Sequence, residues 1–161
     1  MFRHAGGVTA VVFLIACQAC GAGGVRATFQ PFPQAITDTI AGEPDAIVEQ
    51  LADLLQDEGI ELRWVRAHEG YVETKWFDPV SGKSGGGRSL NTDGIVRMRF
   101  WTDIVAQHES VVVGEAVNRR VVDPSLPVRE TEAHVPPEHP GYAILQRVIE
   151  SLAAASHGHE H

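Results

Sequence analysis

The stretch 60–122 constrains the fold most, because its pattern predicts consecutive β-strands joined by turns with no helical segment between them. β-branched and aromatic residues are concentrated in four runs and turn-forming residues lie between the runs. The four strands are expected at 60–67, 71–77, 95–105 and 111–122. Glycines from Gly82 to Gly94 predict a long loop between the second and third strands, and 106–110 is expected to be a turn. Strands connected without a crossover helix predict an antiparallel sheet.

Alternation within the strands predicts which side chains share a face of the sheet. The pattern is clearest in the third strand, where apolar residues alternate with arginines: Val96, Met98 and Phe100 against Arg97 and Arg99. In the first strand the same rule places Leu62 and Trp64 on one face. One face of the sheet should therefore be apolar and the other polar.

Two amphipathic helices flank the strands. The first is expected over 45–58, after Pro44 and before Gly59, which suit the first turn and the C-terminal cap. The second starts near Pro140, after a proline-rich crossing segment at 123–141. Each helix has one apolar stripe, and the predicted buried residues are Ile47, Leu51, Leu54, Leu55, Ile144, Leu145, Val148 and Leu152.

These elements predict an α+β domain in which two helices pack on one face of a four-stranded antiparallel sheet. Weak alternation before Ile40 allows a short fifth strand. The domain is expected to span 32–155, followed by a histidine-rich tail at 156–161.

The N-terminus has the pattern of a secretory signal peptide over 1–16. Arg3 and His4 precede an apolar segment at 8–16, which is shorter than the roughly 20 residues that a membrane-spanning helix needs. The run Leu14-Ile15-Ala16-Cys17 resembles the lipobox of bacterial lipoproteins. The resemblance implies diacylation of the Cys17 thiol, cleavage before it, and a lipid-anchored protein of the cell envelope.

Two other processing sites stay open: a plain signal peptide cut near Ala19 or Ala22, and lipidation at Cys20. Lipidation at Cys17 leaves Cys20 without a disulfide partner. Residues 17–31 are then a flexible tether in composition. Gln18 stands where many Gram-negative bacteria use Asp to retain lipoproteins in the inner membrane, which favours the outer membrane.

The charge of the chain disfavours nucleic acid as a partner. The net charge is -8, and cleavage before Cys17 removes Arg3 but no acidic residue, leaving 12 basic against 21 acidic side chains, or -9. Phosphate backbones repel such a domain.

The order of elements resembles the helix-grip domain of BamC-like outer-membrane assembly lipoproteins. The resemblance rests on the lipobox at Cys17, the helix at 45–58 and the strand-then-Asp-Pro segment at 71–79. It covers one domain and implies a helix-grip fold, and it transfers no functional residues.

Several motifs resemble catalytic or metal-binding sites, but the surrounding sequence does not support these roles. Gly82-x-Ser84-x-Gly86 matches a hydrolase nucleophile elbow in letters, but a strand rather than a helix follows it. The pairs His68-Glu69 and His108-Glu109 lack the second histidine of a zinc-binding helix. His157, His159 and His161 alternate in the tail without a supporting shell of ligands. No catalytic residue, metal site or cofactor is therefore expected.

The candidate contact residues are the three tryptophans, Trp64, Trp76 and Trp101, because tryptophan often anchors interfaces. The alternative is that they fill the core. The leading functional hypothesis is a non-enzymatic envelope lipoprotein that binds or assembles with another envelope protein. The alternative is a small-molecule or lipid-binding domain with a pocket between the sheet and the C-terminal helix. An exposed aromatic patch favours the first hypothesis, and a closed apolar cavity favours the second.

Overall fold

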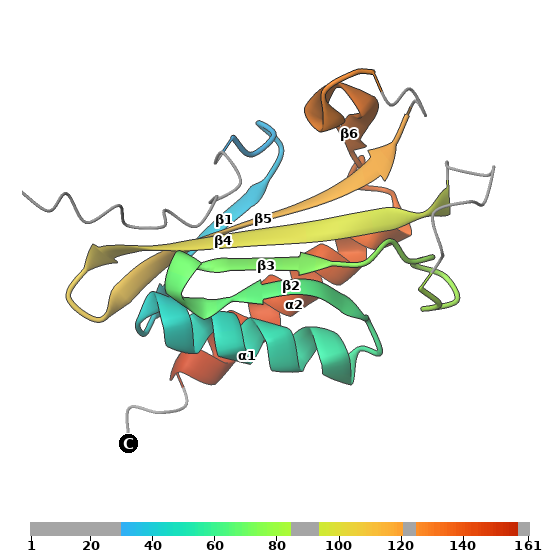
Figure 1. The fold of residues 1–161 in the computed structure, drawn as a ribbon. Helices are drawn as coiled ribbons and strands as arrows, with labels where there is room; N and C mark the ends of the chain where they lie inside the picture. The colour runs from blue at the N-terminus through green and yellow to red at the C-terminus, as the bar shows by residue number, and fades with distance from the viewer. Residues whose placement is uncertain (1–29, 85–93, 121–124, 158–161) are drawn as a thin grey trace, which may run out of the picture.

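The computed structural model describes residues 30–84, 94–120 and 125–157. Within these ranges the chain forms an antiparallel sheet of six strands and two helices (Figure 1). The strands are β1 (Ile36–Ala41), β2 (Leu62–Arg66), β3 (Tyr71–Thr74), β4 (Val96–Ala106), β5 (Glu109–Arg119) and β6 (Glu132–His134). The helices are α1 (Pro44–Asp57) and α2 (Pro140–His157), with two 3-10 turns, η1 (Ala67–Glu69) and η3 (Val128–Thr131).

The sheet has the order β1-β5-β4-β3-β2, and β6 also pairs with β5. β1 pairs with the first half of β5, from Glu109 to Gly114, and β6 pairs with its end, from Val117 to Arg119. Both therefore lie along the edge of β5 that is opposite β4. Every pairing is antiparallel, as predicted for the four turn-linked strands, which are β2 to β5.

Both helices pack on the same face of the sheet, α1 against β2, β3 and β4, and α2 against β1 and β5 (Figure 1). The apolar residues of the alternating strands point toward these helices. Six of the eight predicted stripe residues are buried, while Leu54 and Ile144 are partly buried against the same core. The predicted packing of two helices on one sheet face is confirmed.

Helix α2 lies very close to β5, and a glycine makes that approach possible. A Cβ atom at Gly114 would lie 2.8 Å from Ile149 Cδ1 and 2.9 Å from Leu145 Cδ1. Because even one added carbon atom would be too close to these side chains, there is no space for a ligand between α2 and the sheet at this position.

The sheet is larger than the four strands that the sequence predicts. β1 is the possible fifth strand, and β6 lies inside the segment that we expected to be an extended crossing. The sequence does not predict β6, because a three-residue strand is too short to show alternation and because prolines surround it. The turn between β4 and β5 is also shorter than expected, because Ala106 and Glu109 already belong to strands. Finally, α2 extends to His157, two residues beyond the predicted end of the domain.

The prediction that Leu62 and Trp64 share a face is wrong. Leu62 pairs with Thr74, and Trp64 pairs with Glu73, because the register shifts between them. Such a bulge inserts one residue and moves the following side chains to the other face.

Several predictions fall outside the described residues: the signal peptide, the lipobox at Cys17, the tether up to residue 29, most of the glycine-rich loop, and the tail beyond His157. Ser84 lies just inside, where it forms an isolated bridge with Phe77.

Candidate functional site

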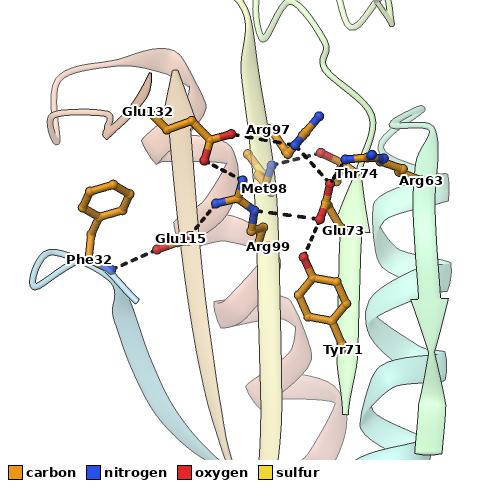
Figure 2. Close-up of polar contacts among 10 residues, drawn as sticks. All are labelled: Phe32, Arg63, Tyr71, Glu73, Thr74, Arg97, Met98, Arg99, Glu115 and Glu132. Atoms are coloured by element: carbon orange, nitrogen blue, oxygen red, sulfur yellow. Dashed lines mark hydrogen bonds and ion pairs between the residues drawn. The ribbon is translucent and has the colours of Figure 1, made fainter. Parts of the chain in front are cut away.

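The candidate site is the face of the sheet turned away from α1 and α2, which we call the open face. Strand alternation brings polar and aromatic side chains there. The central row runs across three strands, because Glu73 pairs with Arg99 and Arg99 pairs with Glu115. The neighbouring row contains Tyr71 opposite Trp101. Figure 2 shows Tyr71 and the central row in front of the sheet, with the helices behind it.

Arg99 lies at the centre of an ion-pair network on the open face (Figure 2). Its Nη1 donates to Glu115 Oε1 at 3.1 Å and its Nη2 donates to Glu132 Oε2 at 2.5 Å. Its Nε lies 3.9 Å from Glu73 Oε2. One guanidinium thus joins carboxylates from β3, β5 and β6, which are far apart in the sequence.

Two further arginines complete the network around Glu73. Arg63 Nη1 donates to Glu73 Oε1 at 2.7 Å, and Arg97 Nη1 lies 3.2 Å from the same oxygen. Arg97 Nη1 is also 3.8 Å from Glu132 Oε1. Three arginines therefore neutralise three glutamates, and we call these six residues the ion-pair network.

Five of the six side chains are buried although neither helix covers this face. The side chains of Arg97 and Arg99 are 9% and 10% exposed, and Glu115 is fully buried. Burying a charge is costly unless it is paired and hydrogen-bonded. The mutual pairing of these residues is therefore a condition for their burial.

The electrostatics of the network favour the charged forms. Burial raises the pKa of the Glu73 carboxyl, but the hydrogen bond from Tyr71 and the charges of Arg97 and Arg99 outweigh it and leave the pKa below its usual value. Burial lowers the pKa of Arg99, but its three glutamate partners raise it above the usual value. The pKa of Tyr71 is raised, first by burial and then by its hydrogen bond to Glu73.

All three predicted contact residues lie on the open face, around the network. Trp101 packs against Tyr71, with ring centroids 5.6 Å apart. Trp76 lies under Arg97, whose Cζ is 4.3 Å from the ring centre. These two tryptophans are buried, at 3% and 7% exposure, as the alternative of a filling role predicts.

Trp64 differs from the other two, because it is 43% exposed at the outer end of the sheet. The guanidinium carbons of Arg66 and Arg63 lie 4.9 and 5.7 Å from the centre of its ring. The next residue, Val65, is also exposed, but it pairs with Val72 and lies on the opposite face of the sheet. We call Trp64 and its two arginines the Trp64 patch.

The segment before β1 also reaches the open face. The backbone N–H of Phe32 donates to Glu115 Oε2 at 3.0 Å (Figure 2). The ring of Phe32 meets the edge of the His134 imidazole at 6.2 Å. The segment before β1 thus packs against the ion-pair network and donates one hydrogen bond to it.

Sequence reasoning did not find the network, although it placed Arg97 and Arg99 on the polar side of their strand. Glu73, Glu115 and Glu132 are acidic residues in strand-like positions, which is a weak signal for pairing. Charged residues that alternate with apolar ones on two strands are the only sign available before the register is known.

Two hollows open on the other side of the molecule, near the end of α1. One has a volume of about 440 Å³ and is lined in part by Ile60, Phe77, Ile144 and Arg147. The second has about 570 Å³ and is lined by Ile60, Leu62, Val65 and neighbouring residues. Both are open to solvent rather than closed, and neither lies between α2 and the centre of the sheet.

The remaining motifs are scattered. His68 lies in η1, and His108 lies in the β4–β5 turn with its Nδ1 3.1 Å from Glu43 Oε1. In the described ranges there is no group of three histidine, cysteine, aspartate or glutamate residues that could hold a metal ion. Nor does the described part contain a helix long and apolar enough to span a membrane.

Neither the known protein-family models nor the curated proteins contain a match to this chain.

Proposed function

We propose that this chain is a lipid-anchored, non-enzymatic protein of the cell envelope whose domain binds another protein through the Trp64 patch. The observation that carries the binding proposal is the exposure of Trp64 between two arginines. Tryptophan and arginine are the residues that most often dominate the binding energy of interfaces. An exposed aromatic ring already held by two guanidinium groups loses little conformational freedom on binding.

The anchor rests on the sequence at the N-terminus. Leu14-Ile15-Ala16-Cys17 follows an apolar segment of signal-peptide length, and Gln18 favours the outer membrane. The domain would then face the periplasm. Wild-type protein should partition into detergent, while Cys17→Ser should be released or remain unprocessed. A mature N-terminus at another residue without acyl mass would contradict the anchor.

The domain itself is consistent with the helix-grip type that the sequence resembles, since two helices pack on one face of an antiparallel sheet. A binding role also suits the chemistry of the open face. The carboxylates there are engaged by arginines, and the lowered pKa of Glu73 suits a permanent charge rather than a general acid.

Photo-cross-linking tests the patch directly. A photoreactive residue at Arg66, which lies beside the Trp64 ring on the open face, should give a specific adduct in envelope membranes. One at Asp53, exposed on α1, should not. Trp64→Ala should abolish the adduct at position 66. Val80→Ala is the matched control, because Val80 is an exposed apolar residue away from the patch. Equal adducts at both positions, or an adduct unaffected by Trp64→Ala, would refute the role of the patch.

A small apolar ligand is the second candidate, favoured by the 440 Å³ hollow beside α2. Binding pockets of roughly 300–1,000 Å³ are typical for such ligands. A spin-labelled fatty acid should then be displaced when Ala143→Trp fills the hollow. The same result in the wild type and the variant would eliminate this candidate.

A further inference from the structure

The two strands at the ends of the main sheet order, β1 and β2, differ in how they are protected against pairing with another chain. Edge strands expose unpaired N–H and C=O groups, and proteins usually blunt them with bulges, basic side chains or short length. β2 has all three features: it is five residues long, its register shifts after Leu62, and it contains Arg63 and Arg66. Strand addition at β2 is therefore disfavoured.

β1 is protected less completely. Its six residues pair with β5 in one uninterrupted register, and it contains no basic residue and no proline. Thr37, Asp38 and Thr39 are exposed. In the described part of the chain, no segment pairs with the edge of β1 that faces away from β5.

The register identifies which backbone groups of β1 point outward. The N–H of Gly42 donates to the carbonyl of His108 at 2.8 Å, so this pair is hydrogen-bonded. Hydrogen-bonded and non-hydrogen-bonded pairs alternate in an antiparallel ladder. Asp38 and Ile40 therefore bond to β5, whereas the N–H and C=O groups of Thr37, Thr39 and Ala41 point away from it.

One side chain touches this edge. Asp38 Oδ1 accepts a hydrogen bond from the backbone N–H of Thr39 at 2.8 Å, and this N–H is one of the outward groups. The carboxylate thus caps the middle of the edge. A strand that pairs with β1 must displace it, which a basic residue of that strand would favour by pairing with Asp38.

The surroundings of β1 are acidic as well. No lysine or arginine occurs between Ile36 and Leu62, while this stretch contains Asp38, Glu43 and Asp45 near the strand. Glu109 lies opposite Ala41 on β5. A second copy of the chain would bring a second acidic edge against this one, so a basic partner is the better fit.

We propose that the outer edge of β1 accepts an added strand from a partner that carries a basic residue opposite Asp38. The outward groups of Thr37, Thr39 and Ala41 supply the main-chain hydrogen bonds, as in other cases of strand addition. Asp38 supplies the charge preference. The site is separate from the Trp64 patch, at the other end of the sheet (Figure 1).

Amide hydrogen exchange on the full chain in detergent micelles tests this proposal. The probe is a short peptide of alternating threonine and valine with one central lysine, and the matched probe has glutamate in its place. At saturation the lysine peptide should slow exchange of the Thr37 and Ala41 amides by at least about tenfold. The Ile40 amide already bonds to β5 and should not change. The glutamate peptide should bind more weakly.

Two variants sharpen the test. Asp38→Asn should remove the preference for lysine over glutamate, and Asp53→Asn, an exposed change on α1, should leave it intact. Thr39→Pro removes only an outward N–H and should abolish binding, with near-ultraviolet circular dichroism as the check of folding. A proline at the centre of the peptide gives the same test without altering the protein.

Four results would overturn the proposal: no slowing at saturating peptide, equal binding of the lysine and glutamate peptides, protection along β2 instead of β1, or protection that rises with protein concentration alone. The last would identify a second copy as the occupant. None of these results bears on the cross-linking of the Trp64 patch, so the two proposals can fail separately.

Discussion

The two faces of the sheet are buried by different chemistry. On the helix side, Val72, Met98 and Phe100 are buried against apolar stripes, and each contact contributes on its own. On the open face, Arg99 and Glu115 are nearly as buried, but only because each neutralises the other. Alternating residues of one strand can therefore be equally inaccessible for opposite reasons. The two faces should respond differently to mutation.

The largest effect is expected from breaking the network at its centre. Arg99→Met leaves Glu73, Glu115 and Glu132 without their shared partner, and an uncompensated buried charge typically costs about 3–5 kcal/mol. The free energy of unfolding, measured by urea titration, should fall by that amount.

Replacing the whole group distinguishes pairing from burial. If Arg99→Met is combined with Glu115→Leu and Glu132→Leu, most of the lost stability should return, because the stranded charges are removed together. A triple variant that is less stable than the single one would show that the network contributes more than charge neutralisation.

On the helix face, Leu145→Ala should cost about 2–5 kcal/mol through lost burial and the resulting cavity. Leu145 is fully buried and faces Gly114 across the contact of α2 with β5. The matched control is Ile104→Ala, at an exposed residue near the β4–β5 turn. This variant should change the free energy of unfolding by less than about 0.5 kcal/mol. Similar losses at both positions would contradict the observed packing.

Lowering the pH should weaken the ion-pair network on the open face. The pKa of Glu73 in the folded state lies below its ordinary value of 4.5, so its contribution is present above that pH and is lost as the pH falls through the folded value. The free energy of unfolding, measured from pH 7 down to about pH 3, should fall more steeply in the wild type than in Glu73→Gln. Parallel curves would refute the coupling.

The smallest effect on stability is expected at Trp64. Because its ring is 43% exposed, Trp64→Ala should change the free energy of unfolding by no more than about 0.5–1 kcal/mol. A stable variant that loses the adduct at position 66 would separate binding from folding. A large loss of stability would instead assign Trp64 to the support of β2.

Local patterns predicted much of the helix face. The stripes of α1 and α2 follow a 3.6-residue period, and Val96, Met98 and Phe100 follow a two-residue period. These periods depend only on backbone geometry, so they can be read without knowing the partners. The same alternation placed Arg97 and Arg99 on the polar face, where the structure has them.

The failures share a cause. The shift between Leu62 and Trp64 depends on how β2 pairs with β3, and a single sequence does not reveal a bulge. β6 is too short to show a period and exists through its pairing with β5. The network needs Arg99 beside Glu132, residues that are 33 positions apart.

The two helices, most of the strands and the antiparallel connections could be predicted from the sequence, because these follow from short-range periodicity and turn chemistry. The tertiary contacts determine which charges are neutralised, which tryptophan is exposed and which edge strand lacks a bulge. Those outcomes depend on register, and register is set by contacts between strands that are distant along the chain. A one-residue shift leaves every local pattern intact and still exchanges the residues on the two faces. For this reason Trp64 lies on the open face, although its own strand predicted that it would share a face with Leu62.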